Sequence, residues 1–373
     1  VAIVVYKGLI PVVGRILTIY RQCKVLINDA TRENIWHIKF ARMFDMSNDS
    51  HLFYTYSQLV DKGAKLEGNK FLLNNQFYVP LYEGKMIWHY NHHFGTINEG
   101  TKEKPARQMA MPTSDELKNP NHNIMPWYWI PKEDMDNRLI KTDAKGNIIW
   151  EWSHKWLIGF RDITNATHDR TFVISLIPDA CGVGHSATLL FVERGTMPGA
   201  LLLGMMSSLV FDYATRQKIG GSHASISFVK QFPVLTPEQV SSSGYEQDIV
   251  ERVARLCWFN HDLDGWMEEL REECPEEYDL PEEPVIWDEE QRTVWQAELD
   301  AIFAHLYGLT TEDLRYILDP EDVCGKGCIN ETFRVLKERE LRELGEYRTK
   351  RLVMEAWNKF EFDNKLKMLC YEK

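Results

Sequence analysis

One short segment, residues 216–223, gathers residue types that bind anions. It reads RQKIGGSH and combines two cations, a glycine pair, a hydroxyl and an imidazole, which belong to Arg216, Lys218, Gly220, Gly221, Ser222 and His223. A helix that ends at a glycine pair can adopt positive φ easily, and successive backbone N–H groups then form a concave anion site. The turn therefore suits a phosphate oxygen or the edge of a base. A plain helix–turn–strand connection with solvated cations explains the same residues equally well.

A second polar loop, residues 161–171, directly precedes an apolar run. It reads RDITNATHDRT and offers candidate nucleic-acid contacts from Arg161, Thr164, Asn165, Thr167 and Arg170. A third polar segment, residues 85–93, adds Lys85 and His89. Its three histidines could suggest a metal ion, but only His89 and His93 have i, i+4 spacing, and no helix is evident there. We therefore predict surface or hydrogen-bonding histidines and no metal site.

The segment Pro178–Gly184 (PDACGVG) is the strongest enzymatic motif in the chain. It resembles the loop that binds S-adenosylmethionine in DNA adenine methyltransferases. The residues that follow, SATLLFVE, are typical of a strand, whereas a cofactor loop should open a helix. The Asp/Asn-Pro-Pro-aromatic motif that holds a flipped adenine is absent, and the pair Asn119-Pro120 lacks both the second proline and the ring. We therefore predict no catalytic residue and no cofactor in this chain, with S-adenosylmethionine binding at 178–184 as an alternative.

The net charge of −12 argues against a nucleic-acid partner, but the charges are unevenly distributed. Residues 1–240 carry 26 Lys and Arg against 22 Asp and Glu, whereas residues 241–373 carry 17 against 33. The acidity thus belongs to the C-terminal third. The apolar N-terminal stretch is interrupted by Lys7, Pro11 and Arg15, so it does not predict a membrane span. The seven thinly spread cysteines fit a reducing cytosol, and we expect the chain to be a piece of a longer polypeptide.

Apolar periodicity predicts a mixed α/β region up to about residue 240. We expect a hairpin around Asn74-Asn75, a largely exposed loop over 96–147, strands at 172–177, 187–192 and 225–229, and one helix from 199 to the glycine pair. Beyond residue 240 the pattern is helical. One helix should close at Gly308, the next should open with a capping box at Thr310, and residues 331–360 should also be helical.

Several blocks resemble the C-terminal half of large adenine-N6 DNA methyltransferases, namely type IIG-like restriction–modification enzymes and related methylases of BREX and DISARM phage-defence islands. The blocks run through the chain in order and include IKFARMFDMSNDSHLF (38–53), FYVPLYEGKMIWHYNHHFGT (77–96), IGFRDITNATHDRTFVISLIP (158–178), VFDYATRQKIGGSHASISFVKQFPVL (210–235), AELDAIFAHLYGLTTEDLRYILD (297–319) and ETFRVLKERELRELGEYRTKRLVMEAW (331–357). The resemblance implies a linker to an absent catalytic domain over 1–70, a DNA target recognition domain over 71–240 and a helical acidic region over 241–373.

The same resemblance implies partners and residue roles. Double-stranded DNA, an upstream catalytic domain that uses S-adenosylmethionine, and further defence-system subunits would be the partners, in a cytoplasmic setting. Phosphate contacts would come from Lys85, Arg161, Arg170, Arg216 and Lys218, and base-edge contacts from Asn165, Thr167, Ser222 and His223. The acidic helices would face away from DNA. A module that only assembles with other proteins is the remaining alternative.

Overall fold

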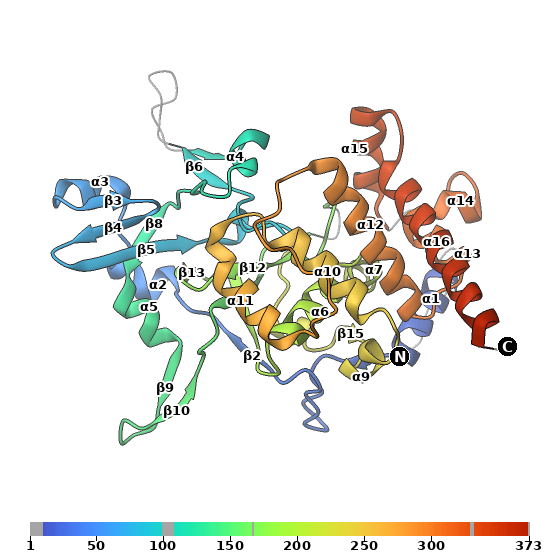
Figure 1. Cartoon of the computed structure of the whole chain (residues 1–373), viewed down its shortest axis with the longest axis horizontal. Helices are drawn as coiled ribbons and strands as arrows, with labels where there is room; N and C mark the ends of the chain where they lie inside the picture. Colours follow the sequence, from blue (N-terminus) through green and yellow to red (C-terminus); the bar gives the residue numbers. More distant parts are fainter. Residues whose placement is uncertain (1–9, 99–107, 166–167, 329–331, 372–373) are drawn as a thin grey trace.

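A computed structural model describes residues 10–98, 108–165, 168–328 and 332–371. Two larger β-sheets and their loops occupy one side of the molecule, and helices from the last third of the chain occupy the other (Figure 1). The predicted mixed α/β architecture with a helical C-terminal region is confirmed. The two parts contact each other through one shared hydrophobic core.

The central sheet has four antiparallel strands in the order β12–β11–β14–β2. Their bounds are Ile174–Pro178 for β12, Trp156–Arg161 for β11, Ala187–Val192 for β14 and Ile38–Ala41 for β2. Every residue of β14 is buried, which explains its uninterrupted apolar run. The strand predicted at 187–192 is confirmed at the same bounds, and the one predicted at 172–177 begins two residues later.

The second sheet is mixed and forms the far end of the molecule. Its order is β13–β5–β4–β3, and β8 pairs with β5; β13 runs parallel to β5. The bounds are Gly182–Val183 for β13, Gln76–Tyr82 for β5, Lys70–Leu73 for β4, Lys65–Glu67 for β3 and Tyr128–Pro131 for β8. Asn74 and Asn75 join β4 to β5 with φ of 49° and 66°, a two-residue turn that needs positive φ at both positions. The predicted hairpin is confirmed.

The segment predicted as exposed loop over 96–147 is more ordered than expected. It contains β6 (Thr96–Asn98), β7 (Gln108–Ala110), α4 (Ser114–Lys118), α5 (Lys132–Arg138) and β9 (Ile140–Thr142), which pairs with β10 (Ile148–Glu151). Strand β8 lies in the same segment, and Trp129 and Ile130 are fully buried there. The prediction was wrong because the few apolar residues of this segment pack against elements outside it: β8 pairs with β5, and Trp129 packs against Phe71 of β4.

The helix predicted from 199 to the glycine pair is two helices, α6 (Thr196–Ser207) and α7 (Leu209–Arg216). Ser208 separates them with extended backbone, and its side chain caps α7 by accepting from the N–H of Phe211. No single helix in the described part of the chain is long and apolar enough to cross a membrane; α6 and α7 pass only as a pair, bent by 61°.

The strand predicted at 225–229 is the short helix α8 (Ile226–Val229). Strand β15 (Pro233–Val234) follows it and pairs with β1 (Lys24–Val25). An apolar run this short carries no reliable period, so the sequence could not separate a strand from one helical turn.

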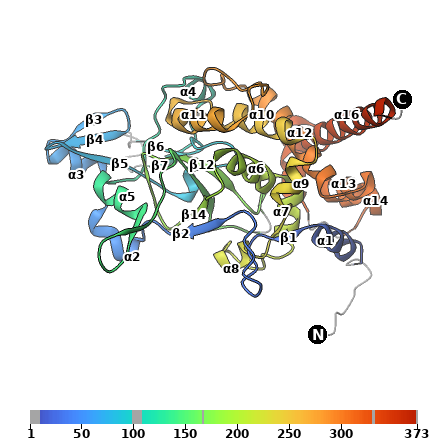
Figure 2. The same ribbon diagram turned by 60° about the horizontal axis from the view of Figure 1, so that its bottom comes forward.

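The C-terminal helices pack in series, starting from α6, which contacts strands β12 and β14 of the central sheet. Helix α6 contacts α10 and α11, α12 contacts α10, and α16 contacts α12 (Figure 2). Their bounds are Glu246–Cys257 for α10, Asp264–Glu273 for α11, Glu289–Leu306 for α12, Thr311–Leu318 for α13, Pro320–Cys324 for α14, Arg334–Leu344 for α15 and Arg348–Tyr371 for α16. Gly308 follows α12 with φ of +68°, and Thr310 opens α13 with a capping box, so both predicted helix boundaries are confirmed.

One hydrophobic core extends through all three segments inferred from the resemblance, from Ile19 to Phe360. The N-terminal segment takes part directly, because β2 belongs to the central sheet and the indole of the buried Trp36 donates to the carbonyl of Leu235. The remaining elements are α1 (Ile10–Gln22), α2 (Met46–Asp49), α3 (Tyr56–Asp61), α9 (Pro237–Ser241) and the 3-10 turns η1 (Ser50–Leu52), η2 (Gly84–Met86) and η3 (His261–Leu263).

Candidate nucleic-acid interface

The structure brings two of the predicted polar segments together. The Thr164 N–H donates to the Ser222 carbonyl over 2.9 Å, and the Ala224 N–H donates to the Asp162 carbonyl over 2.7 Å. Ile163 and His223 pair as an isolated β-bridge between these bonds. We call residues 162–165 together with 220–223 the turn–loop surface. Its exposed residues are Ile163, Asn165, Gly220, Gly221, Ser222 and His223.

The glycine pair does not adopt the conformation expected from the sequence. Neither Gly220 nor Gly221 has positive φ, so the concave site of successive N–H groups is not formed by a left-handed turn, and that expectation was wrong. A Cβ atom at either position would meet nothing within 4 Å. The turn is thus open to solvent, and its polar side chains, not its glycines, offer the chemistry.

The imidazole of His223 is the most clearly positioned polar group of this surface. Its Nδ1 lies 2.9 Å from Oδ2 of Asp162, while its side chain keeps 59% of its area exposed. The guanidinium of Arg42 lies 3.8 Å from the other carboxylate oxygen of Asp162 and is 51% exposed. A mostly buried carboxylate therefore orients two exposed donors. Arg42 was missed by the sequence interpretation, because only its approach to Asp162 distinguishes it from other surface arginines.

Arg216 lies inside the protein and not on the turn. Its guanidinium donates to the carbonyls of Thr332, His168 and Asp169, and the last two bonds measure 2.9 and 3.1 Å. The group also lies over the ring of Phe333, 4.8 Å from its centroid. Burial lowers the pKa of Arg216, although Asp212 opposes that shift. These contacts give Arg216 a structural role between the polar loop and the C-terminal helices, in place of the expected contact with phosphate.

The other two predicted arginines also have internal partners. Arg170 donates to the buried carboxylate of Asp212 over 2.8 Å and to the carbonyl of Ser207. Arg161 donates to the carbonyls of Gly84 and Ile87, and it stacks over the ring of Trp88 at 4.8 Å. Burial lowers the pKa of Arg161 to about 10. Both guanidinium groups thus hold the predicted segments in place.

The remaining predicted residues are distributed between surface and interior. Lys85 is 44% exposed and pairs with Glu83 at 2.6 Å. Lys218 is partly exposed, and its Nζ donates to the Gln231 carbonyl over 3.2 Å. His89 is 2% exposed; its pKa is lowered well below the usual value, first by burial and then by Arg170 and Arg161. Thr164 is buried and donates to the Thr171 carbonyl. Thr167 lies outside the described residues.

Two cavities adjoin the polar loop. One of about 290 Å³ is lined by Trp88, Arg161, Thr164 and Arg170, among others. A larger one of about 720 Å³ separates this loop from α12, α15 and α16, and its charged lining includes Arg170, Arg292, Arg339, Arg348, Glu289 and Glu340. The acidic C-terminal region therefore presents cations as well as carboxylates next to the predicted recognition segments.

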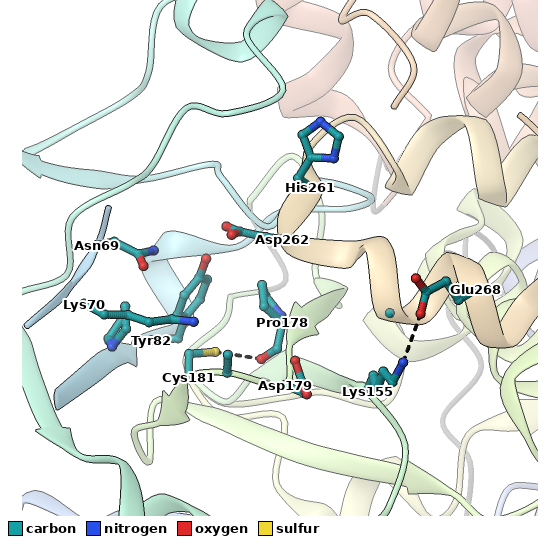
Figure 3. A pocket seen from close by; sticks show the side chains of 13 residues that line it. Asn69, Lys70, Tyr82, Lys155, Pro178, Asp179, Cys181, His261, Asp262 and Glu268 are labelled. Atoms are coloured by element: carbon teal, nitrogen blue, oxygen red, sulfur yellow. Dashed lines mark hydrogen bonds and ion pairs between the residues drawn. The ribbon is translucent and has the colours of Figure 1, made fainter. Parts of the chain in front are cut away.

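The segment 178–184 does not lead into a helix. It continues into β13 and then β14, as its sequence indicates. The Cys181 thiol contacts the Pro178 carbonyl at 2.9 Å, and the segment lines a separate cavity of about 330 Å³ together with Lys70, Lys155 and Asp262 (Figure 3). The helix N-terminus that would receive a cofactor in the resembling loop is missing at this position.

No protein-family model matches this chain, and no curated protein matches it.

Proposed function

We propose that this chain is the DNA target recognition module of an adenine-specific N6-methyltransferase of a restriction–modification or phage-defence system. The observation that carries the proposal is the turn–loop surface. Two segments about 60 residues apart in the sequence, both predicted as DNA contacts, meet there and leave Ser222, His223 and Asn165 exposed. The block resemblance described above supplies the methyltransferase context.

The chemistry of this surface suits a duplex. Hydroxyl, imidazole and amide side chains can bond base edges, and nearby exposed cations can bond phosphates. Arg161, Arg170 and Arg216 bind partners inside the protein. The phosphate contacts are therefore assigned to Lys218, Lys85 and Arg42. Arg161, Arg170 and Arg216 act on DNA indirectly, by fixing the loop that carries Asn165.

S-adenosylmethionine binding at 178–184 is the second candidate function. The cavity of about 330 Å³ beside Pro178 and Cys181 supports it. The strand that follows this segment opposes it, because a phosphate- or carboxylate-binding loop normally uses a helix N-terminus. Calorimetry of the full chain with S-adenosylmethionine separates the two proposals, and saturable binding would favour this second one.

The double variant Lys218→Glu/His223→Ala tests the proposed DNA contact. We expect its affinity for a fluorescent duplex library, measured by anisotropy across a salt series, to fall by about 10-fold or more at fixed salt. The slope of log K against log salt should become shallower by about one, the effect of one lost phosphate contact. Neither side chain is fully buried, so the variant should keep its fold.

Lys145→Glu is the matched control for the charge reversal. Lys145 is exposed in the β9–β10 hairpin, which projects from the body of the molecule (Figure 1). The Lys145→Glu variant should bind the duplex library with the same affinity as the unaltered chain. If the unaltered chain shows no salt-dependent binding, the proposal fails and a protein-assembly module is favoured; if the double variant binds normally, the turn–loop surface is not the contact.

A further inference from the structure

Three side chains from two distant parts of the chain converge on one point outside the turn–loop surface. One donor atom each of His92, His93 and Asp262 lies within 4.8 Å of the others. Nε2 of His93 is 2.9 Å from Oδ2 of Asp262. The two histidines lie in the segment between η2 and β6, whereas Asp262 belongs to η3, which precedes α11. The cluster therefore joins the sheet side of the molecule to the helical side.

The two imidazoles have nitrogens that lack any other role. His92 is 1% exposed and His93 is fully buried. Nε2 of His92 and Nδ1 of His93 have no hydrogen-bond partner among the described residues. Buried polar atoms nearly always have a partner, so the orphaned Nε2 of His92 points to a missing ligand. His93 would offer the same ion its Nε2, the nitrogen beside Asp262.

The surroundings hold the three groups in position. The His92 ring packs against Phe259 with centroids 4.8 Å apart. The backbone N–H of His93 donates to the side-chain oxygen of Asn91 over 2.9 Å, and that of Asp262 donates to the side-chain oxygen of Asn260 over 2.9 Å. Ligands fixed by packing and by hydrogen bonds from neighbouring groups are a general feature of metal sites in proteins.

A further histidine and an open side complete the site. The ring of His122 lies 6.2 Å from that of His93, centroid to centroid, and its Nε2 has no described partner. Asp262 also lines the cavity of about 330 Å³ beside Cys181, and its side chain is 26% exposed. In Figure 3 the Tyr82 hydroxyl points from the cavity wall toward Asp262. An ion can thus reach the cluster through this cavity.

We propose that His92, His93 and Asp262 form a binding site for a divalent transition-metal ion, with Zn²⁺ as the best fit. Two imidazoles and one carboxylate are ligands that zinc accepts, and three protein ligands leave a fourth tetrahedral position for water or for His122. The ion connects the η2–β6 segment to η3. This inference is independent of DNA binding, and it revises the sequence prediction of no metal, which used only the i, i+4 spacing of His89 and His93.

The test uses the full chain without a polyhistidine tag, stripped with a chelator and then dialysed against Zn²⁺ or Co²⁺. We expect elemental analysis to find about one zinc per chain, and the Co²⁺ form to show the visible absorption of low-symmetry four- or five-coordination. Zn²⁺ should also raise the melting temperature of the stripped protein. Absence of stoichiometric zinc and of the Co²⁺ spectrum in the unaltered chain would overturn the proposal.

Two variants locate the ion. Asp262→Asn and His93→Gln should each weaken zinc binding by at least about 10-fold, the loss caused even by removing a group that only orients a ligand. Asp262→Asn is nearly isosteric and partly exposed, so it should fold. The control is His261→Gln, because His261 is adjacent, exposed and paired with Asp264 at 2.9 Å. It should keep the affinity of the unaltered chain; normal binding by Asp262→Asn would place the ion elsewhere.

Discussion

Asp212→Ala is expected to lower the free energy of unfolding by about 3–5 kcal/mol, the loss that follows when one partner of a buried ion pair is removed. The Asp212 side chain is fully buried and accepts from Arg170 at 2.8 Å, from the Thr171 N–H at 2.9 Å and from the Phe172 N–H at 3.0 Å. Alanine removes the acceptor of Arg170 Nε and of two backbone N–H groups just before β12, and among the described residues only the Ser207 carbonyl remains as a hydrogen-bond partner of the Arg170 guanidinium. Urea denaturation followed by tryptophan fluorescence measures the change.

Asp248→Ala is the control for this experiment. Asp248 pairs with Arg252 one helical turn away in α10, and its side chain is 38% exposed. Ion pairs one turn apart on a helix contribute about 0.3–0.5 kcal/mol, so the variant should unfold close to the unaltered chain. Equal midpoints for the two variants would show that Asp212 does not anchor the loop before β12.

Asp300→Asn is expected to stabilise the protein progressively as pH rises from 5 to 8. Burial, which is the largest effect, raises the pKa of Asp300 from 3.8 to about 7 despite opposing contributions from Arg170 and from the Leu209 N–H. Above pH 4 the carboxyl of Asp300 loses its proton in the unfolded chain but keeps it in the folded protein. The free energy of unfolding therefore falls as the pH rises, until the folded protein also loses the proton at about pH 7. Asparagine removes that penalty and can still accept from the Leu209 N–H, which lies 2.7 Å from Asp300 Oδ1.

The size of this effect follows from the pKa difference, at roughly 1.4 kcal/mol per pKa unit. The gap in unfolding free energy between Asp300→Asn and the unaltered chain should widen by about 2–3 kcal/mol between pH 5 and pH 8. Comparing the two proteins at each pH cancels the titration of the buried histidines. Asp115→Asn, whose side chain is 93% exposed in its pair with Lys118, should show no widening, and a flat difference for Asp300→Asn would contradict the raised pKa.

Local signals in the sequence predicted the elements that depend on local causes. Asn74-Asn75 forms the expected turn because both residues tolerate positive φ, and Thr310 caps α13 with the carboxylate of Asp313. The strand at 187–192 was predictable because each of its residues is buried on one face of the sheet or the other. No partner from elsewhere in the chain is needed to specify these features.

Features fixed by distant contacts were missed. Arg216 was expected on the surface because cations usually are, but its partners Thr332 and Phe333 lie more than a hundred residues downstream. The break between α6 and α7 was missed because a serine can also lie inside a helix. Only the hydrogen bond that its side chain accepts from the Phe211 N–H shows that Ser208 caps α7. His92 and His93 are separated in the sequence from their third partner, Asp262, by about 170 residues. Neither the periodicity of apolar residues nor the spacing of residues in a motif indicates contacts between segments so far apart in the sequence.

The interior position of Arg216 restricts how the protein can be dissected. A truncation that ends near residue 240 would keep every residue of the turn–loop surface, yet it would delete Thr332 and Phe333 and expose a guanidinium that also holds the carbonyls of His168 and Asp169. The ion pair between Arg339 and Asp169 at 2.8 Å would be lost with it. A minimal fragment that ends where the acidic region begins, at residue 240, would therefore contain the proposed recognition residues without the C-terminal contacts that hold them in position.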